Sequence, residues 1–206
     1  MKKVMLAVAL ATFVFTSCSE AKKENTAAQT ESHEGSHTEA EMPAAGKVVV
    51  EAPDYTATGQ AIKPQVERIL TSYLQLKEAM ISDDAQSAKA NAQSILEAAA
   101  QVKVTALEAD QQKFTTEKLE EIKDSAGKIE GATDIKEQRA NLELLSEATF
   151  ALTKAFGAAS QKLFYQHCPM ANDNQGGYWL SNTQEIRNPY FGKEMLNCGS
   201  NEEVYN

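Results

Sequence analysis

The residues best suited to chemistry are two pairs of sulfur-containing side chains near the C-terminus. Cys168 is followed two positions later by Met170, and Met195 is followed three positions later by Cys198. A spacing of two places both sulfurs on one face of an extended segment, and a spacing of three places both on one face of a helical turn. Soft sulfur ligands select Cu(I), so folding one pair against the other would create a copper or silver site. The predicted metal ligands are Cys168, Met170, Met195, Cys198 and the adjacent His167.

A third cysteine indicates where the protein is located. Lys2 and Lys3 precede an apolar run over residues 4–15, and two small residues then lead to Cys18, which is the pattern of a signal peptide. The run is too short to span a hydrocarbon core of ~30 Å as a helix. The segment resembles the lipobox of bacterial lipoproteins, with Phe15 where leucine is more usual. It implies a signal peptide over residues 1–17, lipidation of Cys18, and a place in the cell envelope, at the outer membrane and facing the periplasm or the surface. The alternative is an ordinary secreted signal with an incidental cysteine.

Two other interpretations of the remaining cysteines stay open. In an oxidising compartment Cys168 and Cys198 fit one disulfide, closing a loop of about 30 residues and contributing roughly 3–4 kcal/mol. Met170 and Met195 would then pack as ordinary apolar side chains. A catalytic Cys168 with His167 as its base is disfavoured, because adjacent residues project apart and no third orienting group is evident. We therefore expect no catalytic residue and no enzyme activity.

Composition limits the partners and the number of domains. The 206 residues allow one domain with a core plus appendages. Twenty basic residues stand against 29 acidic ones, giving a formal charge of −9, which disfavours nucleic acid as a partner. Residues 18–59 are polar and show no periodicity, so we expect a flexible acidic tether. His33 and His37 lie within it, and a solvated linker is favoured over a weak metal site there.

Residues 60–165 carry apolar side chains at steps of three and four, which predicts four amphipathic helices. Short connections between them predict antiparallel neighbours, so the expected fold is all-α, an up-down four-helix bundle. The expected boundary signals are Pro64 in the first helix, a cap at Asp83 with Gln86 for the second, Gly131 ending the third, and a fourth helix from Thr133 or Asp134 to about Tyr165.

The helical region lacks the ligands of common bundle cofactors. It contains no histidine between residues 60 and 166, which excludes the usual di-iron site with its Glu-x-x-His pairs. A haem ligated by His167 would need a methionine near the start of the first helix, but Met80 lies at that helix's other end. No Cys-x-x-Cys-His segment is present for covalent haem attachment. We therefore expect neither haem nor di-iron.

Residues 166–206 form a tail of a different character. Six of the chain's aromatic residues lie between Phe164 and Gly199, a stretch that glycines interrupt. This composition predicts an ordered irregular segment that packs on the bundle within the same domain, with little strand. The spacing Ser181-x-x-Gln184 and the pair Asn188-Pro189 predict one or two short helical pieces.

The tail segments CPMA, YWLS, EIRNPYFG and MLNCG resemble the signature of a bacterial domain family of unknown function. That family occurs as small envelope lipoproteins and is also appended to periplasmic adaptor subunits of copper and silver efflux pumps. The resemblance covers roughly residues 60–200 and implies heavy-metal handling, with Cys168, Met170, Met195 and Cys198 as ligands. The chain lacks the hairpin, barrel and lipoyl-like segments of an efflux adaptor, so the resemblance implies a free-standing version.

Two functions follow as expectations. The first is an envelope lipoprotein that binds Cu(I) for copper handling or efflux support and contacts the membrane through its lipid alone. The second is an interaction module without metal, whose tail is closed by a Cys168–Cys198 disulfide and docks its aromatic surface on an envelope or efflux partner.

Overall fold

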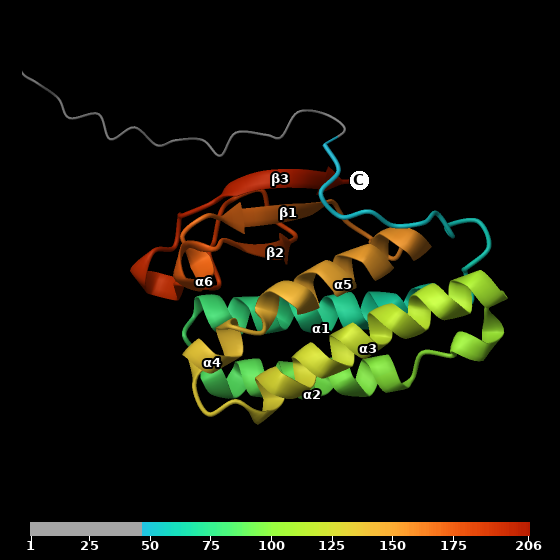
Figure 1. Ribbon diagram of the computed structural model, residues 1–206, viewed down its shortest axis with the longest axis horizontal. Coiled ribbons are helices and arrows are strands. Elements are labelled where there is room, and N and C mark those ends of the chain that lie inside the picture. The colour runs from blue at the N-terminus through green and yellow to red at the C-terminus, as the bar shows by residue number, and fades with distance from the viewer. Residues whose placement is uncertain (1–46) are drawn as a thin grey trace, which may run out of the picture. The chain divides into compact units, whose positions relative to one another are not determined.

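The computed structural model describes residues 47–206 (Figure 1). The predicted signal peptide, Cys18 and the tether histidines His33 and His37 lie outside the described residues. Within residues 47–206, no helix combines the length and the apolar character that crossing a membrane requires.

Helices make up most of the described chain. The long helices pack in sequence order, α1 on α2, α2 on α3 and α3 on α5, and α5 packs back on α1. Successive long helices run in opposite directions (Figure 1), so the expected antiparallel bundle is present. The helices are α1 (Lys63–Ile81), α2 (Ala85–Ala100), the 3-10 turn η1 (Val104–Ala106), α3 (Ala109–Gly131), α4 (Ile135–Arg139) and α5 (Leu142–Phe156).

Local signals in the sequence explain most helix boundaries. Pro64 lies in the first turn of α1, where its missing N–H costs no hydrogen bond. The cap of α2 is Asp84, whose side chain accepts a hydrogen bond from Ser87 N–H, so the predicted cap at Asp83 is wrong by one residue. Asp83 instead adopts a positive φ of 60° in the preceding turn. Helix α3 ends at Gly131, as predicted.

The predicted fourth helix is interrupted once and ends early. It is divided into α4 and α5 at residues 140–141, and it ends at Phe156 rather than near Tyr165. Gly157 ends α5 in the left-handed conformation, with φ of 60°, which glycine adopts without steric cost. The apolar spacing continues as far as Leu163, but the segment Leu163–Cys168 is rich in aromatic residues and forms a strand instead.

The expectation of an all-α fold is wrong for the tail. Three strands, β1 (Leu163–Cys168), β2 (Gly177–Ser181) and β3 (Ser200–Tyr205), form an antiparallel sheet in the order β2-β1-β3. The described domain is therefore helix-rich with a small sheet. The short α6 (Ala171–Asn174) has left-handed residues inside it, and the 3-10 turn η2 (Gly192–Glu194) is the helical piece between β2 and β3. No helix forms at Ser181–Gln184.

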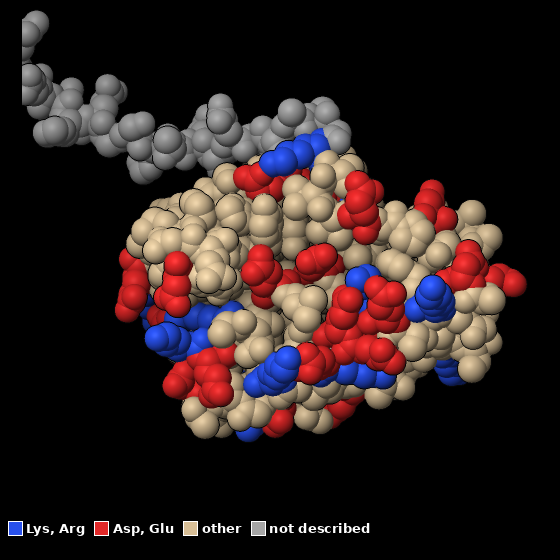
Figure 2. Space-filling view, in the orientation of Figure 1, with Lys and Arg blue, Asp and Glu red and all other residues tan. Residues whose placement is uncertain are grey.

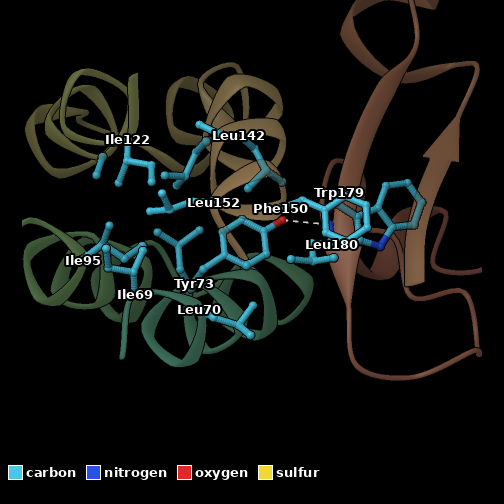
Figure 3. Close-up of a cluster of buried hydrophobic side chains, with 14 of the residues drawn as sticks. Ile69, Leu70, Tyr73, Ile95, Ile122, Leu142, Phe150, Leu152, Trp179 and Leu180 are labelled. Atoms are coloured by element: carbon cyan, nitrogen blue, oxygen red, sulfur yellow. Dashed lines mark hydrogen bonds between the residues drawn. The ribbon is translucent and has the colours of Figure 1, made fainter. Parts of the chain in front are cut away.

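The sheet and the bundle share one core (Figure 3). Tyr73 on α1 joins them, because its hydroxyl lies 2.7 Å from Ser146 Oγ on α5 and accepts a hydrogen bond of 3.0 Å from Leu180 N–H on β2. Burial raises the pKa of Tyr73 to about 12. Val50, within the segment expected to be a tether, is buried against this core.

Gly127 offers a direct test of the α3 assignment. It lies inside α3, and a Cβ added there would have no heavy atom within 4 Å. We expect Gly127→Ala to raise the free energy of unfolding by about 0.5–1 kcal/mol, because alanine restricts the unfolded chain and favours the helix. Urea unfolding followed by circular dichroism measures the change. Gly157→Ala, at the left-handed end of α5, is the control and should destabilise the protein.

Candidate functional site

The structure brings together the two cysteines of the tail. Cys168 is the last residue of β1 and is buried, whereas Cys198 lies two residues before β3 and is half-buried. Their Sγ atoms are 2.6 Å apart, although 30 positions separate the two residues in the chain. The contact therefore joins a half-buried cysteine to a buried one.

Strand pairing explains why these residues meet. In the β1–β3 ladder His167 lies opposite Ser200, so the chain just before β3 passes the end of β1. Gly199 makes the approach possible, because it adopts a φ of 146° and a Cβ there would lie 2.8 Å from the His167 carbonyl oxygen. The same Cβ would lie 2.8 Å from the Trp179 ring, so only glycine fits beside Cys198.

The surroundings of Cys198 hold its thiol in the protonated form. Burial, and then the neighbouring Cys168, raise its pKa to about 11. A thiol with so high a pKa is a poor nucleophile near neutral pH, because the thiolate is the reactive species. Metal binding at this thiol would have to release its proton.

The other predicted ligands lie in different surroundings. Met170 follows the buried Cys168 closely, but its side chain is 44% exposed. Met195 is half-buried in the turn before Cys198, whose N–H donates to the Met195 carbonyl oxygen at 3.3 Å. Neither methionine side chain shares a hydrogen bond with a cysteine in the described chain.

His167 faces away from the cysteine pair. Successive residues of a strand point to opposite faces of the sheet, so His167 and Cys168 project apart. The imidazole packs against Tyr178, with ring centroids 4.2 Å apart, and burial lowers the pKa of His167. No cluster of three or more His, Cys, Asp or Glu residues within 47–206 is arranged to hold a metal. The site that the structure assembles is the pair of thiols.

Asn188 holds the chain around Cys198 and was not predicted to do so. It is fully buried, and its Nδ2 donates to the Cys198 carbonyl oxygen at 2.8 Å. Its Oδ1 accepts hydrogen bonds from the N–H groups of Tyr190 and Phe191, at 2.8 and 3.3 Å. The Asn188-Pro189 pair had indicated a helix cap, and the side chain makes comparable bonds around an irregular turn.

The tail aromatics form a core rather than a surface. Trp179 is fully buried, and its ring meets that of Tyr190 edge-on, with centroids 6.1 Å apart. Tyr165 stacks between Phe150 of α5 and Tyr178, with centroids 5.1 and 5.2 Å away. The stack of Tyr165 on Phe150 fixes β1 against the bundle, and Trp179 with Tyr190 fills the core under the tail.

Comparison with known proteins finds a match for the helical part alone. A family model described as protein of unknown function (DUF3347) matches residues 69–161, which run from α1 to just before β1. No curated protein and no solved structure matches the chain. The helical part is thus similar to a domain family of unknown function, and the cysteine pair lies beyond the matched residues.

Proposed function

We propose that the protein is a non-catalytic envelope lipoprotein that binds Cu(I), with Cys168 and Cys198 as the metal ligands, in copper handling or efflux support. The observation that supports this function is the contact between the two thiols, 2.6 Å from sulfur to sulfur. Thiolates are the ligands that Cu(I) prefers among protein side chains. Lipidation of Cys18 would tether the domain to the membrane.

A bound ion requires the sulfurs to separate. Metal–sulfur bonds are about 2.3 Å long for zinc. Two such bonds to one ion place the two sulfurs about 4 Å apart. That separation is larger than the present contact of 2.6 Å. Cys198 lies in a turn and is half-buried, so it is the cysteine whose side chain would have to move. Met170 lies two positions after Cys168, and Met195 lies three positions before Cys198. Either methionine is a candidate to supply a thioether as a further ligand. Ag(I) has the same ligand preference and is a second cargo.

Copper retention should depend on both thiols and on pH. We expect the reduced protein to retain about one Cu(I) against a moderate chelator, and Cys168→Ser or Cys198→Ser to abolish retention. Since the pKa of Cys198 is raised to about 11, retention should strengthen as pH rises from 6 to 8, by up to about tenfold per unit for each proton released. Titration with a chromogenic Cu(I) chelator measures both effects.

Two controls sharpen this experiment. Met170→Leu keeps the size of an exposed side chain and removes its sulfur, so it reports whether a thioether contributes. Ser200→Ala, two residues from Cys198, should leave retention unchanged. Reduced protein that releases all copper to the chelator across this pH range would refute the proposed function.

A second candidate function follows from how short the same contact is. Both cysteines are free in the structure, and their sulfurs lie close enough for a disulfide to form in an oxidising compartment. The protein would then be an interaction module docking on an envelope or efflux partner. In Figure 2 the surface near α6 carries few charged side chains, and the exposed residues Met170, just before α6, and Leu144, on α5, are candidates for apolar contact. Absence of free thiols without reductant, with copper ignored after reduction, would favour this function.

A further inference from the structure

The geometry points to control of the cysteine pair by residues 187–198, here termed the positioning loop. The loop acts through its contact with Arg139, at the end of the bundle. This inference rests on the site of the proposed function and names the residues that position it. The cysteines meet only where the positioning loop holds Cys198, and the loop is held by the bundle. Loosening the loop should therefore weaken the pairing of the two sulfurs.

The first link joins Asn188 to Cys198. Besides donating to the Cys198 carbonyl oxygen, Asn188 donates its backbone N–H to the Leu196 carbonyl oxygen at 2.8 Å. Its own carbonyl oxygen accepts from Gly192 N–H at 3.0 Å. These bonds close the positioning loop on itself, with its first turn fixed to Cys198.

The second link joins the positioning loop to the bundle. Arg139, the last residue of α4, donates from Nε to the Pro189 carbonyl oxygen at 2.7 Å. Its Nη2 donates to the Met80 carbonyl oxygen at 2.7 Å and to Asp83 Oδ1 at 2.6 Å. One guanidinium thus binds the end of α1, the turn before α2 and the loop together. The same ion pair holds the pKa of the Asp83 carboxyl below its usual value.

Close packing reinforces this corner. Gly192 has a φ of 55°, and a Cβ there would lie 2.6 Å from the Arg139 Nη2 atom. The loop therefore lies directly on the Arg139–Asp83 pair, with no space for a larger residue. Two hydrogen bonds, Arg139 to the Pro189 carbonyl oxygen and Asn188 to the Cys198 carbonyl oxygen, thus link the bundle corner to Cys198 through the Asn188–Pro189 peptide bond.

The pairing can be measured as a balanced reaction without metal. The two thiols and one molecule of a small dithiol in its disulfide form exchange, giving the Cys168–Cys198 disulfide and the reduced small dithiol. Two electrons and two protons pass from the protein to the small molecule. The equilibrium constant reports how well the fold presents one sulfur to the other.

The test compares the parent full chain with its Asn188→Ala and Arg139→Gln variants. Each protein is equilibrated in buffers of varied ratio of reduced to oxidised dithiothreitol, and its free thiols are then quantified by alkylation. We expect Asn188→Ala to lower the equilibrium constant about tenfold, which raises the midpoint potential by about 30 mV. Arg139→Gln should act in the same direction, and Arg139→Lys, which keeps the charge beside Asp83, should restore part of the loss. Ile122→Val, in the core on α3, controls for a general loss of stability and should leave the constant unchanged.

Each outcome bears on one inference. A constant that stays within twofold of the parent value in both Asn188→Ala and Arg139→Gln would overturn control by the positioning loop. So would a parent protein that forms no disulfide at any buffer ratio. Copper retention by the parent chain, measured in parallel, tests the proposed function separately, since the equilibrium constant is obtained without copper.

Discussion

Lys154→Met is expected to lower the free energy of unfolding by about 3–5 kcal/mol, because it leaves the carboxylate of Glu203 buried without its cation. The Glu203 side chain is 4% exposed and forms an ion pair with Lys154 on α5. Methionine has nearly the volume of the lysine stem but no charge. The large effect therefore comes from the unpaired carboxylate rather than from lost packing.

The pair also holds the chain that enters the domain. Glu203 accepts hydrogen bonds from the N–H groups of Val49 and Val50, at 2.7 and 3.0 Å, and Lys154 donates to the Val50 carbonyl oxygen at 2.7 Å. Residues 49 and 50 are thereby fixed to β3 and α5 together. Lys154→Met should therefore also make this entering segment more susceptible to limited proteolysis than it is in the parent protein.

Urea unfolding of the purified chain measures the change, and Lys128→Met is the matched control. Lys128 pairs with Asp124 on the surface of α3, where both side chains are more than half exposed. An exposed pair of this kind contributes little, so the control should stay within about 0.5 kcal/mol of the parent protein. A loss below 1 kcal/mol for Lys154→Met would show that Glu203 is not held as a buried charge.

The helices could be predicted because their apolar faces repeat at helical spacing. The seam of α1, from Val66 to Met80, is buried throughout, and Gly131 ends α3 as expected. The sheet could not be predicted in the same way. A strand with one exposed face alternates apolar and polar residues, but β1 is buried at five of its six positions. Because the bundle covers one face of β1 and the positioning loop covers the other, β1 lacks the alternation of apolar and polar residues that would have identified it as a strand.

The cysteine pair of the candidate site could be predicted without knowing the fold, because it depends on cysteine chemistry. With Cys18 set aside as the expected lipidation site, Cys168 and Cys198 are the two cysteines left, and both the metal and the disulfide interpretations required them to meet. The positions of His167 and Met170 depend on the strand that the sequence did not reveal: one side chain faces away from the thiols and the other is exposed. Asn188 acts through a hydrogen bond to Cys198, ten positions later in the chain. The Asn188-Pro189 pair was the one local signal of that turn.

Trp179→Ala is the second substitution with a large expected effect, a loss of about 3–5 kcal/mol, because it empties the centre of the tail core. Trp179 is fully buried, packs edge-on against Tyr190, and lies where any side chain at Gly199 would collide with it. The cavity would adjoin the turn that carries Cys198. We therefore expect faster alkylation of both thiols as well as lower stability.

Trp179→Phe separates packing from hydrogen bonding at this position. Among the described residues, the buried Nε1 of Trp179 has no hydrogen-bond partner, so phenylalanine removes volume without breaking a bond. The loss for Trp179→Phe should then be less than half of that for Trp179→Ala, measured by urea unfolding and circular dichroism. Equal losses would mean that the indole N–H is bonded, and a loss below 1 kcal/mol for Trp179→Ala would mean that the sheet does not depend on this ring. Because the ring, Gly199 and Cys198 are adjacent, the intermediate variant should also show an intermediate rate of thiol alkylation.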